Sequence, residues 1–247
     1  PGYTLRMFSD SAARVLKEFV FTRPVTLSGG GMFPMGDDMK LMKGRIRFDA
    51  SAGRVRYPLL GTTLDLGRTK GEVLISPQWV VVDKMMGTIW DGTFTGRVLA
   101  QIDDGDALNG SFVLQDMNLT SIGKSYDKKM EKATVHGAIE FSSKGGNMNS
   151  IQAKGEAALV HGDLVEIPLF GFLGEALSNY IPGLGHLINY KISRADCDFS
   201  IEKGYVRTSN FAAQGSNMSL EGGGWIRLSD LQVNSDFKLG LRGLPGF

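Results

Sequence analysis

The feature of this sequence that most constrains its fold is an alternation of apolar and polar residues. In residues 195–202, every second side chain is apolar, and the side chains between them are acidic or hydroxylic. The same alternation recurs in residues 45–48, 94–102, 134–141, 151–159, 218–228 and 231–239. A period of two over a short run is typical of a β-strand with one apolar and one polar face. Such strands fit an antiparallel sheet with one face in water better than a parallel sheet covered on both faces.

Turn-forming residues separate these runs, for example in 49–53, 103–106, 144–147 and 202–204. Glycine, aspartate and asparagine supply the positive backbone dihedrals that tight hairpins need. The chain holds 33 glycines in 247 residues, nearly twice the average frequency of about 7%. Glycine inside a strand often marks a bulge, a bend or a close approach of the backbone. We therefore expect a mainly β fold: an elongated, strongly curved, mostly antiparallel sheet shaped like a groove, with about a dozen strands or more.

Two or three short helices are expected beside the sheet. Apolar residues at helical spacing from Ala12 to Val20 predict the first helix, with Ser9 or Asp10 as its N-cap. The second begins at Pro168 and also carries apolar residues at helical spacing. This second helix either covers the open end of the sheet or faces a membrane. The lack of a polar face rich in lysine and arginine favours the first alternative.

Composition argues against several classes of protein. The 27 basic and 26 acidic residues nearly cancel, without a basic excess or a basic stripe, so nucleic acid is not an expected partner. The single cysteine, Cys197, excludes an internal disulfide framework and a paired-cysteine site. No apolar run approaches the roughly 18 to 20 residues of a membrane helix. The chain begins at Pro1 without a signal-peptide pattern, and we expect it to be a piece of a longer protein.

Catalytic motifs are missing, so we expect neither enzyme activity nor a cofactor. The sequence lacks a GxSxG elbow, an HExxH helix, a P-loop and a GxGxxG turn. The three histidines, at positions 136, 161 and 186, share no ligand spacing. A calcium loop at 103–106 would need a glutamate at its twelfth position, where Leu114 stands, so a hairpin turn is favoured there.

Two further clusters each allow a chemical and a structural interpretation. The four methionines of residues 32–42 could bind Cu(I) through their thioethers, but Pro34 interrupts the helix that would align them. Filling of irregular apolar space is therefore favoured. The four lysines of residues 124–132 could meet acidic head groups, although a solvated loop or a short polar helix is favoured.

The second half of the chain carries a more specific pattern. Gly-Glu-Ala-Ala-Leu-Val-His-Gly-Asp-Leu at 155–164 is followed by Ile-Pro-Leu-Phe at 167–170. The alternating run at 195–201 is followed by Gly-Tyr-Val at 204–206 and by Gly-Gly-Gly-Trp-Ile-Arg-Leu at 222–228. Together with Trp-Asp-Gly-Thr-Phe-Thr-Gly at 90–96, this order resembles the C-terminal region of the AsmA-like family, whose relatives include TamB and YhdP.

The resemblance covers residues 87–242 and is weaker over residues 1–86. We therefore treat residues 1–247 as one β-rich segment, in which 1–86 hold N-terminal strands and one helix and 87–247 form the AsmA-like C-terminal region. The motifs consist of glycines, turns and alternating apolar residues, and they contain no catalytic residues.

The resemblance implies a role in the envelope of Gram-negative bacteria. Members of the family are usually anchored in the inner membrane by an N-terminal helix and extend a long β-rich body into the periplasm. They are similar to bridge-like lipid-transfer proteins, and their implied role is to move phospholipid towards the outer membrane. The resemblance thus implies a periplasmic segment, whose partners are phospholipid acyl chains, neighbouring segments of the full-length protein, and a membrane reached through segments that this chain lacks.

An apolar groove would suit this role because a lipid tail needs a surface shielded from water. Burying one acyl chain gains on the order of 10 kcal/mol. The residues that we expect to contact lipid tails are Phe94, Val98, Ile102, Val135, Ile139, Phe141, Ile151, Leu159, Phe199, Ile201, Ile226, Leu228, Val233 and Phe237.

Two other functions stay open. The same alternation would serve a closed sandwich or barrel whose apolar face is its core, and the protein would then be a structural or assembly module of the envelope. A carbohydrate-binding module would need exposed aromatic residues on a flat face, and Trp79, Trp90 and Trp225 are too scattered in the sequence to predict one.

Overall fold

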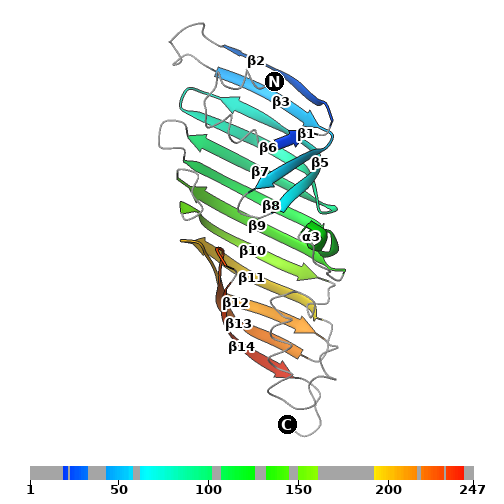
Figure 1. Ribbon diagram of the computed structural model, residues 1–247, viewed down its shortest axis with the longest axis vertical. Helices are drawn as coiled ribbons and strands as arrows, with labels where there is room; N and C mark the ends of the chain where they lie inside the picture. Colours follow the sequence, from blue (N-terminus) through cyan, green and yellow to red (C-terminus); the bar gives the residue numbers. More distant parts are fainter. Residues whose placement is uncertain are drawn as a thin grey trace. The chain divides into compact units, whose positions relative to one another are not determined.

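A computed structural model describes residues 19–21, 23–32, 43–57, 62–101, 107–125, 132–144, 150–160, 192–215, 218–230 and 232–241. These residues form one sheet of fourteen strands that is not closed into a barrel (Figure 1). One short helix, α3 (Leu119–Ser125), accompanies the sheet within these ranges. The prediction of a mainly β, antiparallel fold is therefore confirmed.

The strands follow one another as a meander over most of the chain. Their bounds are β1 Phe19–Phe21, β2 Val25–Met32, β3 Lys43–Ala50, β4 Gly53–Tyr57, β5 Thr62–Ile75, β6 Trp79–Ile89, β7 Gly92–Gln101, β8 Leu108–Asn118, β9 Thr134–Ser143, β10 Gln152–Val160, β11 Ile192–Glu202, β12 Tyr205–Gly215, β13 Met218–Arg227 and β14 Val233–Leu241. From β5 to β14, each strand pairs with the next one in the sequence. Strands that follow one another in this part of the sequence are therefore neighbours in the sheet.

The chain divides into two compact units. Unit 1 comprises Pro1–Val113 together with Glu140–Gln152, and unit 2 comprises Leu114–Ile139 together with Ala153–Phe247. Each unit has its own apolar contacts, and we describe the two separately.

Tight turns of a kind that the glycine- and aspartate-rich segments predict connect several strands. The β11–β12 hairpin turns at Lys203 and Gly204, whose φ angles are 52° and 76°. The β6–β7 hairpin turns at Trp90 and Asp91, with φ angles of 51° and 61°. Two successive positive φ angles match the right-handed twist of the flanking strands. The predicted turn at 202–204 is thus confirmed, whereas 103–106 lies outside the described residues.

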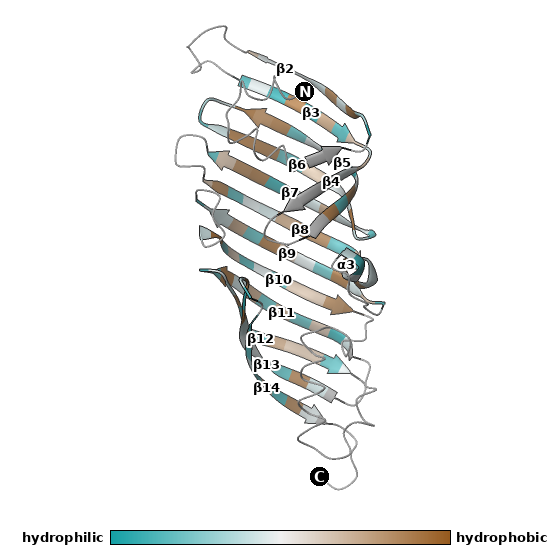
Figure 2. Cartoon of the chain, in the orientation of Figure 1, coloured by the Kyte–Doolittle hydropathy of each residue, from teal (hydrophilic) through white to brown (hydrophobic). Residues whose placement is uncertain are grey.

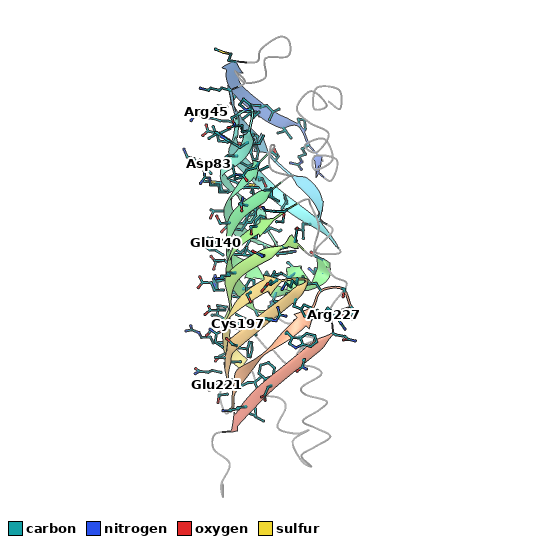
Figure 3. All side chains as sticks on the ribbon, turned by 90° about the vertical axis from the view of Figure 1, so that its left-hand side faces the viewer. Arg45, Asp83, Glu140, Cys197, Glu221 and Arg227 are labelled. Atoms are coloured by element: carbon teal, nitrogen blue, oxygen red, sulfur yellow. The ribbon has the colours of Figure 1, made fainter. Side chains whose placement is uncertain are left out.

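Unit 1 contains a corner that runs across neighbouring strands. The first part of β5, up to Leu66, pairs with β4, and its second part, from Thr69, pairs with β3. In the same way, β1 pairs with β4 and β2 with β3. Figure 3 shows β4 and the first part of β5, in light blue and cyan, on the side of the ribbon opposite to Arg45 and Asp83.

The corner arises because the backbone hydrogen bonding between neighbouring strands is interrupted at the same position along each of these strands. The breaks lie between β1 and β2, where Pro24 cannot donate to a ladder, at residues 51–52 between β3 and β4, and at residues 67–68 within β5. The segment 49–53, which the sequence indicates as a turn, is therefore no hairpin. The chain continues along the same edge of β5 and only changes direction there.

Unit 2 packs its apolar side around α3 and the first residues of β9. The buried cluster consists of Leu119, Ala133, Leu159, Ala195, Ala213 and Leu220, with Ile122, Val135, Phe211, Phe237 and Leu239 packed against it. The side-chain oxygen of Asn118 accepts the N–H of Thr120 at 2.9 Å and so caps the first turn of α3. The N–H of Leu119 donates to the carbonyl of Ala133 at 2.9 Å, which ties the helix to the start of β9.

The described residues include only a small part of the two helices that the sequence predicts. Phe19 and Val20, placed by their spacing in a first helix, lie in β1 and pair with β4. Aromatic and β-branched residues suit strands, and the pairing partner outweighs the helical spacing here. The rest of that predicted helix and the one beginning at Pro168 lie outside the described residues. Only the last two residues of α3, Lys124 and Ser125, belong to the lysine-containing segment 124–132, and residues 126–131 lie outside the described residues.

Candidate functional site

Direct cross-strand partners point to the same side of a sheet, so the register assigns each residue to a face. In unit 2, Gly155 lies opposite Phe199 and Leu159 opposite Ala195, and these residues form an apolar face. Figure 2 shows hydrophobic and hydrophilic residues alternating along the strands. The other apolar-face residues that this register places in unit 2 are Ala153, Ala157, Cys197, Ile201, Val206, Phe211, Ala213, Leu220, Ile226, Val233, Phe237 and Leu239.

Unit 1 has an apolar face of the same kind. Phe94 lies opposite Gly87 in the β6–β7 ladder, and Val98 lies opposite Val82. Phe94 is 7% exposed and is thus almost fully shielded from water. The other members that the registers place on this face are Ile46, Phe48, Ala50, Leu66, Val73, Ile75, Val80, Ile89 and Ala100.

The fourteen residues expected to contact lipid can now be placed. Those that the strand registers put on the apolar face of their unit are Phe94, Val98, Leu159, Phe199, Ile201, Ile226, Val233 and Phe237. Of the three in β9, Val135 packs against the unit 2 cluster, while Ile139 and Phe141 follow it at even spacing. Ile151 is buried immediately before β10, and Leu228 follows β13. Ile102 lies outside the described residues.

Phenylalanine rings lean against glycines of the neighbouring strand on these apolar faces. An added Cβ on Gly87 would come within 2.8 Å of the Phe94 ring, closer than real Cβ contacts. The Gly–Phe pairs of this kind are Gly71 with Phe48, Gly87 with Phe94, Gly96 with Phe112, Gly110 with Phe141, Gly155 with Phe199 and Gly222 with Phe237. These six glycines thus mark close approach, one of the three meanings that the sequence allowed.

The rings also contact one another across strands. In unit 1, Phe112 lies 6.4 Å from Phe94 and 6.0 Å from Phe141 between ring centroids, and the planes of Phe112 and Phe141 are parallel within 1°. In unit 2, Phe211 and Phe237 flank Gly222 in one row, with their rings 5.6 Å apart and nearly perpendicular. Such arrangements suit the charge distribution of aromatic rings.

Phe112 is a residue that sequence reasoning missed. Val113 and Leu114 follow it directly, and they hide the two-residue period in this strand. A signal was available, however, because Gly110-Ser-Phe112 repeats the glycine–x–phenylalanine spacing of Gly92-Thr-Phe94.

The single cysteine of the chain lies on the apolar face of unit 2. Cys197 is half-buried and sits opposite Ala157. Burial raises the pKa of this thiol above its ordinary value of 9.0, and the charges of Asp198 and Asp196 raise it further. The thiol is therefore protonated at neutral pH and behaves as a small apolar side chain.

The chemical alternatives find little support in the described ranges. Within them, no group of three or more histidine, cysteine, aspartate or glutamate side chains is placed to hold a metal ion. His136 accepts a hydrogen bond from the Asp116 N–H through Nδ1 at 3.3 Å. Of the methionines proposed for copper, Met32 alone is described, at the exposed end of β2. The possible calcium segment 103–106 lies outside the described residues.

No described helix has the length and apolar character needed to cross a membrane. No protein-family model, curated protein or solved structure matches the chain.

Proposed function

We propose that this protein binds phospholipid through its acyl chains, along the apolar face that each unit of the sheet presents, and performs no covalent chemistry. One observation carries the proposal: the sheet is not closed, and each unit presents an apolar face lined by aromatic and branched side chains. A sheet normally buries such a face against a second layer. Among the described elements, α3 in unit 2, and β4 with the first part of β5 in unit 1, are the ones that lie where they could contribute to such a layer.

Lipid tails have the physical properties that this face requires. Apolar surface gains roughly 25 cal/mol per Å² when it leaves water, so a tail lying on the face stabilises both partners. The outer face stays in water, because Lys154, Glu156 and Asp198 occupy the alternate positions of β10 and β11. Glu156 lies directly opposite Asp198, which is tolerable only where solvent screens the two charges.

The cellular setting of the proposal rests on the resemblance to the AsmA-like family. We place this segment in the periplasm of a Gram-negative cell, in a protein anchored in the inner membrane. There it supports outer-membrane biogenesis by carrying phospholipid between the two membranes. Its partners are acyl chains and neighbouring segments of the full-length protein.

The second candidate function is a structural or assembly module of the envelope with a closed β core. The strand order disfavours a closed core, because β14 at one end of the sheet has no second partner strand among the described residues. The two functions differ in a measurable way, since a filled core leaves no site for an acyl chain.

Native mass spectrometry of the purified chain, followed by organic extraction, tests the proposal. We expect bound phospholipid that decreases strongly in Val98→Asp, which places a charge on the apolar face of β7. The control is Asn234→Asp, which places the same charge on an exposed position of the outer face of β14 in unit 2. A protein that is free of lipid and takes up no fluorescent phospholipid would favour the structural module.

A further inference from the structure

The outer, polar face of unit 1 gathers basic side chains from strands that are distant in the sequence. The registers align residues of β2, β3, β5 and β6 in rows across this face. One row runs Gly30–Arg45–Leu74–Val81, the next Ser28–Arg47–Glu72–Asp83, and the next Thr26–Asp49–Lys70–Met86. Figure 3 shows Arg45 and Asp83 along one side of the ribbon.

We name the six exposed basic residues here the basic patch: Lys43, Arg45, Arg47, Arg68, Lys70 and Lys84. Three acidic residues, Asp49, Glu72 and Asp83, lie among them, which leaves an excess of three positive charges. The chain as a whole has a net charge of only +1. The patch is therefore a local concentration of charge.

The polar face of unit 2 has no such excess. Its strand positions from β10 to β14 hold five basic residues, Lys154, Arg194, Arg207, Arg227 and Lys238, and six acidic residues, Glu156, Asp196, Asp198, Glu202, Glu221 and Asp236. Unit 2 thus offers a natural comparison with lysines of similar exposure and without the positive excess.

Ion pairs within the patch hold its arginines in place without hiding them. Glu72 is 7% exposed and lies between two guanidinium groups, since the Nε atoms of Arg45 and Arg47 are each 3.3 Å from its Oε1. Arg68 binds Asp49 at 2.6 Å. The three arginine side chains remain 61%, 71% and 72% exposed. They can therefore reach further anions from solvent.

Apolar residues border the patch on the same face. Leu74, Val81 and Leu99 form one row, in which Val81 is almost fully buried. Trp79, on the next row of β6, is 37% exposed, and Met86 is 41% exposed. Tryptophan beside lysine and arginine is typical of surfaces that meet the interface between lipid head groups and acyl chains.

A shallow hollow lies within the patch. It measures about 350 Å³, and Ser28, Arg45, Arg47, Lys70 and Lys84 contribute to its lining. Guanidinium and ammonium groups with a hydroxyl are suitable donors for phosphate oxygens.

From charge complementarity and the exposed tryptophan, we propose that the polar face of unit 1 binds the surface of an anionic phospholipid bilayer. The basic patch contacts lipid phosphates, and Trp79 enters the interfacial region. An acidic protein or a nucleic acid would use the charge but would not need the tryptophan. This surface is opposite to the apolar face of unit 1, so its binding to a bilayer does not depend on acyl-chain binding.

Flotation of the full chain with phosphatidylcholine vesicles, with and without phosphatidylglycerol, tests the inference. We expect binding only to the vesicles with phosphatidylglycerol and weakening with salt. The triple variant Lys43→Gln, Lys70→Gln, Lys84→Gln should bind about a hundredfold more weakly, since each lysine near an anionic surface contributes about 1 kcal/mol. The matched triple variant Lys154→Gln, Lys203→Gln, Lys238→Gln removes the same charge from unit 2 and should bind like the parent. Circular dichroism checks that both variants fold.

Tryptophan fluorescence provides the second readout. Vesicles with phosphatidylglycerol should shift the emission to the blue in the parent and in Trp225→Phe, but not in Trp79→Phe. Equal binding by the two triple variants would overturn the inference. Binding to soluble polyglutamate or to an oligonucleotide as tightly as to the vesicles would also overturn it and would indicate a different acidic partner.

Discussion

The ring of Phe141 lies against the backbone of Gly110 on the neighbouring strand, so close that a methyl group on this glycine would come within 2.6 Å of the ring. The carbonyl oxygen of Arg97, on the other side, would lie at 2.9 Å from the same methyl group. Gly110 is therefore held between an aromatic ring and a backbone atom, and a side chain larger than hydrogen has no room.

Gly110→Ala should destabilise the protein by about 1–3 kcal/mol, because the methyl group forces either the ring or the strand to move. Urea unfolding, followed by circular dichroism, measures this loss as a lower midpoint. Gly30→Ala is the matched control, since a Cβ there meets no atom within 4 Å. Equal midpoints for the two variants would show that the Phe141 ring moves away freely.

Asn210 should be important for the register between β11 and β12. The ladder shifts between Asp196 and Ser200, and there Asn210 donates to the Asp198 carboxylate at 2.7 Å and accepts the Asp198 N–H at 2.9 Å. Asn210→Ala should lower the free energy of unfolding by about 1–2 kcal/mol, because it removes both hydrogen bonds. Gln214→Ala, at an exposed position of the same strand, should change it by less than about 0.5 kcal/mol. A neutral Asn210→Ala variant would contradict this role.

Cys197 should react slowly with maleimide at neutral pH, because burial and two neighbouring carboxylates raise its pKa above 9.0. The rate should rise with pH and continue to rise beyond pH 9.0, as the thiolate forms late. A cysteine at Gln152, exposed on the outer face of β10, in a Cys197→Ala background is the fast-reacting control. If acyl chains occupy the apolar face, added phospholipid should protect Cys197 and leave the control cysteine unchanged.

The Asp49–Arg68 pair should be visible in a titration. The hydrogen bond from Arg68 lowers the pKa of Asp49 below its ordinary value of 3.8. A lowered carboxyl pKa stabilises the folded state above the ordinary value, and this contribution is lost as the pH falls through the lowered pKa. Arg68→Gln should therefore raise the pKa of Asp49, as measured by NMR of its carboxyl carbon. An unchanged pKa would mean that solvent already screens the pair completely.

The sequence alone could predict the strands whose side chains alternate clearly, together with the apolar phase of these strands. Side chains in a strand repeat every two residues, so Phe199 and Ile201 had to share a face once one of them was buried. The same logic placed Val233 and Phe237 together, and the registers agree.

Features that depend on pairing between distant segments could not be predicted. Lys43, Lys70 and Lys84 are separated by many residues, and only the registers of β3, β5 and β6 bring them to one face. The corner in unit 1 was missed for the same reason, because residues 49–53 carry the composition of a hairpin turn. Only the shared partner β5 shows that the chain does not reverse there.

The phenylalanines that lean on glycines also affect how an elongated molecule could travel over the apolar face. A ring that leans on the neighbouring strand lies close to the sheet. Phe94, Phe112 and Phe141 therefore form a flat, continuous aromatic surface on the sheet. Side chains that stand perpendicular to the sheet would divide this surface into separate pockets, each matched to one tail. If acyl chains bind this face as we propose, a surface without such pockets suits passage of tails of different length better than storage of one chosen lipid.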